Sequence, residues 1–467
     1  MCVLMTRTSC CKSIPKHAKY FQYTTAFCVG ILQFSVNSVN VWISPVLPHL
    51  TSDVSVIGVT LTQEEASWAI ATVGLGVTMA SLVIGICLDR IGPKFILLLS
   101  SALTIASWIC FFFAKSLAVL IVGRFLAGIG QGIALICCPI YMCEVADKEI
   151  RGKIGTIPSG MGMLGTVFVL MAGPYLSYTH LVIACAVFPI AFFIMFLLIP
   201  DSPYFLIKVG KIEAAKASIA RFSRLSITNE EIDAMAKKVE EIVEQDAASS
   251  LSITLSSLHF RRSMAIALAA KLIISFCGIS VITPYLHTIL ESGASSISPK
   301  LSSVIYGFIA IPGLILSVLL LDKIGRRPVF CASSLGAGIS IIGEGVYLYL
   351  DDQVDLEKVS FLPVLCLTSY KFWISLGILH LPYFIVGELF TTNTKRMAAL
   401  VIIFCTGILT FLNVKVFGSV FESWGMYTMC WFFGGVTLCG VIFAFFILPE
   451  TKGKTLADIH DGLTKRN

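Results

Sequence analysis

Long apolar segments recur along almost the whole chain and limit what it can fold into. A helix needs about 20 mostly apolar residues to cross a bilayer, and 467 residues are enough for twelve such helices with their loops. Only 13% of the residues are charged, about half the share of an average soluble domain. This composition excludes an ordinary soluble enzyme, a disordered protein and a nucleic-acid-binding protein, and it predicts an all-α membrane protein. The apolar segments lie at about 22–45, 67–88, 95–113, 117–143, 154–176, 180–199, 264–290, 301–321, 328–350, 361–387, 398–421 and 426–448.

A long polar segment separates the first six predicted spans from the second six. It contains the charge-rich stretch NEEIDAMAKKVEEIVEQ, in which apolar residues recur at helical spacing, namely Ile232, Met235, Val239 and Ile242. This pattern predicts an amphipathic helix outside the hydrocarbon. The expected organisation is an N-terminal segment, a six-helix bundle, a helical linker, a second six-helix bundle and a tail, at 1–21, 22–199, 200–263, 264–448 and 449–467.

Lysine and arginine are concentrated on one side of the predicted membrane. That side holds both termini, the linker, and the loops after the second, fourth, eighth and tenth spans, whereas the opposite loops carry only Lys115, Lys300 and Lys358. Basic segments remain in the cytoplasm. We therefore expect a multi-pass protein of the plasma membrane with both termini in the cytoplasm.

The two halves of the chain contain matching motifs in the same order and on the same predicted face. This indicates a duplicated six-helix unit, which is typical of transporters that bind substrate near the membrane midplane between two halves. The pairs are LDRIGPK (88–94) with LDKIGRRP (321–328), YMCEVADKEIRG (141–152) with FIVGELFTTNTKRM (384–397), and PDSP (200–203) with PETKG (449–453).

These motifs resemble those of the major facilitator superfamily and, within it, the sugar porter family. Within this family, the chain most resembles facilitated trehalose transporter-like proteins. This resemblance rests on the sequences of three segments, ASW (66–68), IPSGMGMLGTV (157–167) and SGASSISPKLSSVIYG (292–307). The family resemblance rests on GICLDRIGPK (85–94), GRFLAGIGQG (123–132), PIYMCEVADKEIRGKIG (139–155), PDSPYFLIKVGKIEAA (200–215), DKIGRRP, PYFIVGELF (382–390) and LPETKGKTLADI (448–459).

Two matched sets of charges lie at the predicted cytoplasmic ends of the helices. We expect them to form charge-assisted pairs that break when those ends separate, and so to stabilise the outward-open state, as the resemblance also implies. The alternative is that the charges only orient the chain in the membrane. The residues are Asp89, Arg90, Glu144 and Arg151 in the first half, and Asp322, Arg326, Arg327, Glu388 and Arg396 in the second.

The predicted substrate pathway departs from what the resemblance implies. Sugar porters place two glutamines on the seventh helix, where this chain has Ile274 and Ser275, and Pro284 replaces the first of two tyrosines. The loss of two amides removes donors and acceptors for sugar hydroxyls, so the sequence also allows an altered substrate. For the serines, helix packing is an equally good interpretation. The candidate binding residues are Ser159, Ser275, Ser280, Tyr285, Tyr383 and Asn413.

The first predicted helix contains no aspartate or glutamate. By the resemblance, a proton-driven sugar porter has a carboxylate there, facing an arginine of the fourth helix; this chain retains Arg124 but has Asn37 near the acidic position. An asparagine does not titrate. The sequence therefore predicts facilitated diffusion without proton coupling.

Other ionisable residues fall inside predicted spans. Glu344 and Lys371 lie 16 residues from Pro328 and Gly387 respectively, which places both ~24 Å from the cytoplasmic helix ends. Because an unpaired charge at such a depth is unfavourable, we expect the two to form an ion pair, which serves helix packing or transport. His380 is a candidate pH-sensitive group or a buried, hydrogen-bonded imidazole.

The function expected from the sequence is facilitated diffusion of trehalose or a hexose by alternating access, without catalysis. The alternatives are a proton-coupled or altered-substrate porter and a non-transporting sugar sensor. We expect a monomer whose partners are a sugar and the lipid bilayer, with no nucleic acid. The 16 cysteines are scattered through apolar stretches, where free cysteine acts as a small hydrophobe, so no metal site or cofactor is predicted.

Overall fold

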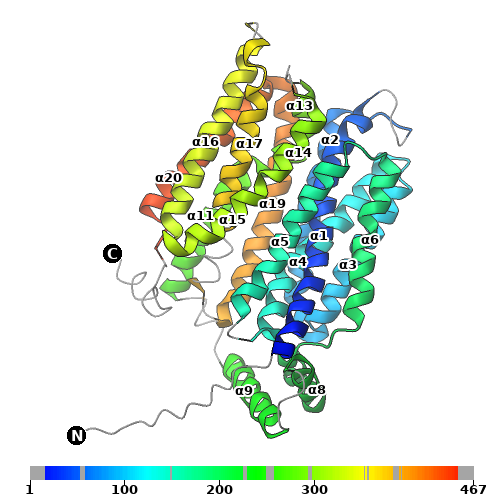
Figure 1. Ribbon diagram of the computed structural model, residues 1–467, viewed down its shortest axis with the longest axis vertical. Coiled ribbons are helices and arrows are strands. Elements are labelled where there is room, and N and C mark those ends of the chain that lie inside the picture. The colour runs from blue at the N-terminus through cyan, green and yellow to red at the C-terminus, as the bar shows by residue number, and fades with distance from the viewer. Residues whose placement is uncertain are drawn as a thin grey trace, which may run out of the picture.

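The computed structural model describes most of the apolar part of the chain. The described residues are 16–52, 58–147, 150–223, 229–248, 257–292, 297–351, 353–354, 357–381, 389–390 and 392–450. They form helices that run roughly parallel to the long axis of the molecule (Figure 1). Among these residues, ten helices are long and apolar enough to cross a membrane. This confirms the predicted all-α membrane fold.

The first six helices pack into an N-terminal group, which we call the N-lobe. Glycines let these helices approach closely: a Cβ on Gly128 of the fourth helix would lie 2.2 Å from the carbonyl oxygen of Val73 on the second. The N-lobe helices are α1 (Lys16–Thr51), α2 (Gln63–Ile91), α3 (Pro93–Phe112), α4 (Leu117–Val145), α5 (Arg151–Ala172) and α6 (Tyr178–Leu197).

The second group, the C-lobe, has two interrupted spans. The predicted span 264–290 is divided among three helices. In the predicted span 361–387, helix α17 ends at Leu376, and Gly377 leaves helical geometry (φ −146°, ψ −63°). The C-lobe helices are α11 (Leu258–Phe276), α12 (Ile279–Ile282), α13 (Leu286–Ser292), α14 (Pro299–Phe308), α15 (Ala310–Lys323), α16 (Arg326–Asp351), α17 (Leu362–Leu376), α19 (Thr392–Trp424) and α20 (Met426–Phe446), with a short 3₁₀ helix at Glu357–Val359.

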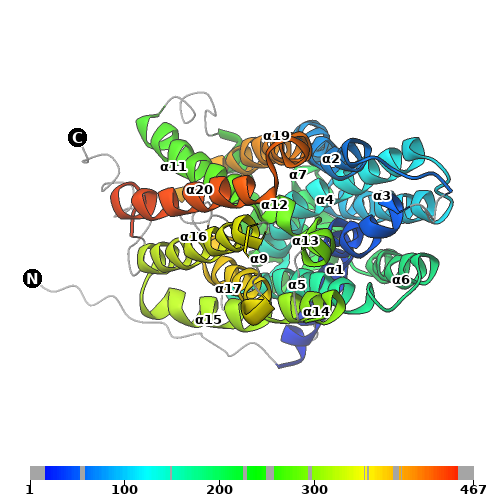
Figure 2. The same ribbon diagram turned by 90° about the horizontal axis from the view of Figure 1, so that it is seen from above.

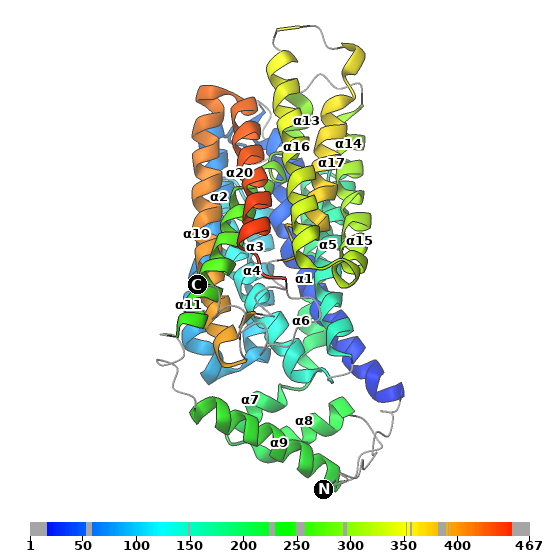
Figure 3. The same ribbon diagram turned by 90° about the vertical axis from the view of Figure 1, so that its left-hand side faces the viewer.

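Three helices of the linker lie beyond one end of the two lobes (Figures 1 and 3). We call this end the linker face and the other end the opposite face. The three are α7 (Pro203–Lys208), α8 (Ile212–Ser223) and α9 (Asn229–Ala248), and an ion pair of 2.8 Å between Lys216 and Asp233 joins α8 to α9. This aspartate raises the pKa of the Lys216 ammonium.

The linker helix α9 is amphipathic, as predicted, but its buried stripe is shifted. Val239 and Val243 pack against Leu206 and Ile207 of α7, whereas Met235 is exposed. Its partner is α7, which meets α9 on the side of Val239 and Val243.

The two lobes meet along specific helix pairs. Seen from above, α2 lies beside α19 and α5 lies beside α14 (Figure 2), and both pairs are in contact. The α2–α19 interface is close enough that a Cβ on Gly74 would lie 2.5 Å from the carbonyl oxygen of Gly407. On the α5 side, the hydroxyl of Ser303 donates to the carbonyl oxygen of Leu170 at 3.1 Å, in the half near the opposite face.

Candidate functional site

The seventh span breaks near its middle, between α11 and α12. Gly278 has φ +99°, a left-handed conformation in which glycine has no steric penalty. A Cβ at this position would also lie 2.7 Å from the ring of Phe433. Glycine is therefore required at position 278 both by the backbone conformation and by the short distance to Phe433. Discontinuous helices of this kind expose main-chain polar groups in the binding sites of transporters.

Asn413 of α19 bonds to both sides of this helix break. Its side-chain amide donates to the carbonyl oxygen of Ser275 on α11 at 2.6 Å and to the hydroxyl of Ser280 on α12 at 3.0 Å. Asn413 and Ser275 are buried. Three predicted binding residues are thus brought together in one polar, uncharged cluster, which we call the Asn413 cluster.

The other predicted binding residues lie elsewhere. Tyr285 is buried next to the same span, with its ring 5.0 Å from that of Phe417. Ser159 is exposed on the linker-face half of α5, and no described hydrogen bond joins it to the Asn413 cluster. Tyr383 lies outside the described residues.

Two tyrosines that sequence reasoning missed also hold the broken span. The hydroxyl of Tyr370, on α17, donates to the carbonyl oxygen of Cys277 at 2.9 Å. The hydroxyl of Tyr306, on α14, is 3.3 Å from that of Thr283 just after α12. All four residues are buried. Their roles depend on contacts between helices distant in the chain, so no local pattern marked them.

The predicted Glu344–Lys371 ion pair is wrong. The Ser340 and Ser369 hydroxyls are 2.9 Å apart, which sets the antiparallel register of α16 and α17 and places Lys371 level with residue 338. Glu344 is six residues further along α16, or about 9 Å. Both Glu344 oxygens are buried without a hydrogen-bond partner in the described part of the chain. The predicted depth failed because it measured the tenth span as one continuous helix down to Gly387.

His380 follows the interruption of the tenth span. Its Nε2 is buried and has no hydrogen-bond partner among the described residues. The interpretation of His380 as a hydrogen-bonded imidazole therefore stays a prediction.

Arg124 is fully buried in the N-lobe and binds main-chain oxygens. Its Nη1 donates to the carbonyl of Val39 on α1 at 2.8 Å, and its Nε donates to that of Ala69 on α2 at 3.2 Å. The side chain of Asn37 donates instead to Gln33 of its own helix at 2.9 Å. Helix α1 contains no aspartate or glutamate. The described partners of Arg124 are thus carbonyl groups, which do not titrate.

Part of the predicted charge network lies at the linker face of the α2–α19 interface. Asp89 accepts from Arg396 across the lobes, and it accepts from Lys208 of α7 at 2.6 Å. Glu144, which is half-buried, is within electrostatic range of Arg396 and Lys208. Arg90 is exposed. Lys208 was not predicted as a member, although it lies in one of the motifs.

Asp201 follows α6 at the same face. Burial raises the pKa of its carboxyl, while the main-chain N–H of Ser202, which donates to it at 2.9 Å, and the nearby Lys94 oppose that shift.

The second predicted set has a different partner from the one expected. Glu450, after α20, accepts from the main-chain N–H groups of Arg326 and Arg327 at 3.1 and 3.0 Å. The side chain of Arg327 donates to the carbonyl of Ala444 at 2.9 Å and lies 5.0 Å from the ring centroid of Phe445. The pairing of these two arginines with Glu388 or Asp322 stays a prediction. Glu388, and the side chains of Arg151 and Asp322, lie outside the described residues.

Gly325 makes the Glu450 contact possible, and its replacement should destabilise the C-lobe. It has φ +107°, and a Cβ there would lie 2.7 Å from the Glu450 carboxylate. We expect Gly325→Ala to lower the free energy of unfolding by about 1–3 kcal/mol, measured as a lower thermal midpoint of the purified protein in detergent. Gly155→Ala is the control, since no atom lies within 4 Å of a Cβ there. Equal midpoints for the two variants would contradict the role of Gly325.

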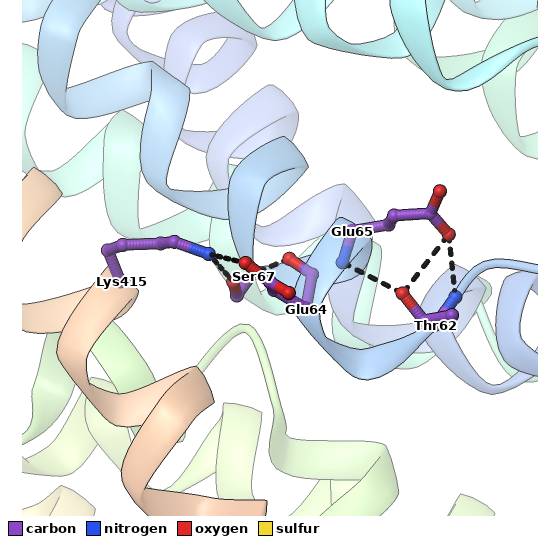
Figure 4. A network of polar contacts seen from close by, with 5 residues as sticks. All are labelled: Thr62, Glu64, Glu65, Ser67 and Lys415. Carbon is purple, nitrogen blue, oxygen red and sulfur yellow. Dashed lines mark hydrogen bonds and ion pairs between the residues drawn. The ribbon is translucent and has the colours of Figure 1, made fainter.

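A second contact between the lobes lies at the opposite face of the same helix pair (Figure 4). Lys415 of α19 is 3.2 Å from the carboxylate of Glu64 and 3.2 Å from the hydroxyl of Ser67, both on α2. It is also 4.5 Å from the ring centroid of Trp68. Glu65 instead closes a capping box with Thr62, which leaves Glu64 to meet the lysine. Sequence reasoning missed Lys415, although a lysine inside a predicted span was the available signal.

The described contacts between lobes are distributed unevenly. At the opposite face, α1 meets α13, α5 meets α14, and Lys415 joins α19 to α2. At the linker face, the lobes meet along α2 and α19 and through the contact of α4 with α19. The linker-face half of α5 is open, because a Cβ on Gly152, Gly155 or Gly160 would have no atom within 4 Å. The arrangement is closed at the opposite face.

Comparisons with known proteins agree with this geometry. A family model described as sugar (and other) transporter matches residues 20–463. The chain is similar to the facilitated trehalose transporter Tret1 of Bombyx mori, with 25% identity covering 95% of this chain and 87% of the relative. It is also similar to Tret1 of Polypedilum vanderplanki, with 26% identity covering 94% and 87%.

Solved structures share the fold. A partially occluded inward-open conformation of the xylose transporter XylE from E. coli has a TM-score of 0.76 at 18% identity, and the match covers 93% of this chain and 99% of that one. The proton:xylose symporter XylE bound to 6-bromo-6-deoxy-D-glucose has a TM-score of 0.74 at 18% identity, covering 95% and 98%. These matches confirm the predicted major facilitator fold, with its two six-helix bundles.

Proposed function

Because the chain belongs to the sugar (and other) transporter family, we propose that it carries trehalose or a hexose across a membrane by facilitated diffusion. Relatives at 25–26% identity are named facilitated trehalose transporters, which supports trehalose as a first substrate. The observation that carries the proposal is the Asn413 cluster. It places an uncharged amide and two hydroxyls at a helix break in the middle of the bundle. A polyhydroxyl ligand that binds there can replace its hydrogen bonds to water by hydrogen bonds to the protein.

The absence of a carboxylate from α1 supports uncoupled transport. A proton-coupled carrier needs a group that binds and releases a proton as the lobes move. Arg124 is held by the carbonyls of Val39 and Ala69, and no carboxylate occurs in α1. The substrate gradient alone then sets the direction of transport.

The proposal includes an orientation and a division of the chain. The linker face is cytoplasmic and the opposite face extracellular, because Lys and Arg concentrate at the linker face. Residues 22–199 and 264–448 form the two moving bundles, 200–263 the cytoplasmic linker, and 1–21 and 449–467 the cytoplasmic ends. The protein acts as a monomer in the plasma membrane, and it is not an enzyme.

The charges at both ends of the α2–α19 interface support alternating access. The described residues include an ion pair between the lobes at each end, Asp89–Arg396 at the linker face and Lys415–Glu64 at the opposite face. Separation of the lobes at either face must break the pair at that face. Such pairs bias the equilibrium between states without blocking it.

Uptake of labelled sugars tests the function. The chain is expressed in cells that lack sugar uptake, and entry of labelled trehalose and glucose is measured with and without an uncoupler. We expect saturable entry of at least one sugar, no accumulation above the external concentration, and no effect of the uncoupler. Uphill accumulation that the uncoupler abolishes would overturn the uncoupled mechanism, and no uptake of any sugar would overturn sugar transport.

A further inference from the structure

A lysine is buried beside the helix break of the seventh span. Lys371 is 5% exposed, and its Nζ lies 5.2 Å from the ring centroid of Tyr306. The hydroxyl of Tyr306 is paired with that of Thr283, and Tyr370, which precedes the lysine, donates to the carbonyl of Cys277. The ammonium therefore lies beside tyrosines that hold the same broken span to which the Asn413 cluster is bonded.

Among the described residues, the buried carboxylate on a helix that packs against α17 is that of Glu344 on α16, and it forms no hydrogen bond with the lysine. Helices α11, α12, α14 and α17 contain no aspartate or glutamate, and neither do α1 and α5. Glu344 lies about 9 Å away in helix register. The face of an aromatic ring attracts a cation but does not neutralise it. A buried ammonium in this position would be stabilised by an anionic ligand that binds beside it.

Several hydrogen-bond donors near the helix break already bind protein atoms, whereas the Ser275 hydroxyl has no partner among the described residues. Both described hydrogen bonds of the Asn413 amide nitrogen go to the protein, one to the Ser275 carbonyl and one to the Ser280 hydroxyl. The Tyr370 hydroxyl donates to Cys277. The polar atoms left for a ligand here include the Lys371 ammonium and Nε2 of His380, which is buried without a partner among the described residues and is within electrostatic range of Lys371.

We propose that the Lys371 ammonium binds the carboxylate of a sugar acid, such as a uronic acid, while the Asn413 cluster lies against its hydroxyls. This inference rests on the proposed function as a sugar carrier and names its substrate class. One lysine balances one negative charge, which favours a carboxylate over a phosphate ester, whose charge is closer to two. His380 is the second side chain near the carboxylate.

The test uses the full-length protein in liposomes and four labelled compounds: glucuronate, glucose, trehalose and glucose 6-phosphate. We expect the protein to take up glucuronate with a KM at least tenfold lower than that for glucose. Lys371→Met should remove this preference, so that the KM values for glucuronate and glucose become similar. Lys371→Arg should retain the preference because it keeps the charge. Lys115→Met, at an exposed lysine of the opposite face, should change neither.

The outcomes separate this inference from the function on which it rests. Uptake of glucose or trehalose with no preference for glucuronate in the unaltered protein would overturn the sugar-acid site and leave sugar transport in place. A preference for glucose 6-phosphate would also overturn it, as would a glucuronate preference that persists in Lys371→Met. Failure to take up any of the four compounds would instead count against the proposed function.

Discussion

Asn413→Ala is expected to lower the rate of sugar uptake per molecule at the cell surface by about 10- to 100-fold. The substitution removes the donor that bridges α11 and α12, and it leaves the buried carbonyl of Ser275 and the hydroxyl of Ser280 without that partner. The Ser280 hydroxyl still donates to the Ser275 carbonyl at 3.5 Å, so the net loss is about that of one unsatisfied buried group, about 1–3 kcal/mol. Each 1.4 kcal/mol is tenfold in affinity or rate. Initial uptake rates, normalised to surface protein, measure the effect.

Asn413→Asp separates hydrogen bonding from shape. Aspartate has nearly the same size but places an acceptor oxygen 2.6 Å from the Ser275 carbonyl, so its loss of uptake should be at least as large as that of alanine. Thr406→Val is the matched control, because the Thr406 hydroxyl donates to Ile402 of its own helix; its uptake should stay within about twofold. Normal uptake by Asn413→Asp would contradict a donor role for the amide.

Lys415→Met should shift the protein towards a state that is open at the opposite face. The substitution removes contacts with Glu64, Ser67 and Trp68 that exist only while α2 and α19 are together at that face. Glu64 is largely exposed, so the ion pair contributes about 0.2–1 kcal/mol, and the contact with the ring adds about 0.5–2 kcal/mol. Together these amount to about 0.7–3 kcal/mol and predict a shift of about 3- to 150-fold in the ratio of the two states.

Accessibility of a buried position at the α5–α14 contact measures this shift. Ser303, whose hydroxyl bonds to Leu170 across the lobes, is replaced by cysteine, and its reaction with a membrane-impermeant thiol reagent is followed in intact cells. The parent without the added cysteine supplies the background, because the chain has 16 cysteines of its own. We expect faster labelling in Lys415→Met and no change in Lys115→Met. Equal labelling in both would show that the Lys415 contacts do not hold this face closed.

Much of the fold could be predicted from local sequence, because membrane crossing depends on the length and apolarity of each segment. The ten long spans of the described residues match predicted segments, with α1 extending further than expected, from Lys16 to Thr51. The break of the seventh span was not predicted. Its signal was Gly278, but a glycine in an apolar segment does not reveal a left-handed conformation until Phe433 and Asn413 are placed around it.

The candidate site could be predicted in part. Ser275, Ser280 and Asn413 were named from the sequence and lie together, whereas Tyr306 and Tyr370 were missed and Tyr383 lies outside the described residues. The prediction of a Glu344–Lys371 pair was wrong because the depth of a residue in the membrane can be counted from its position in the sequence only along a continuous helix. The interruption after Leu376 changed the register that the pair required.

The sequence by itself determined the class of protein, its spans and its duplicated plan, because these follow from hydrophobicity and motif order along one chain. Only the tertiary structure decided which charges meet. Lys415 reaches Glu64, Glu450 caps the start of α16, and Lys371 faces a tyrosine ring. The physical reason is that an ion pair or a hydrogen bond depends on distances of about 3 Å, which are set by helix register and crossing between segments hundreds of residues apart.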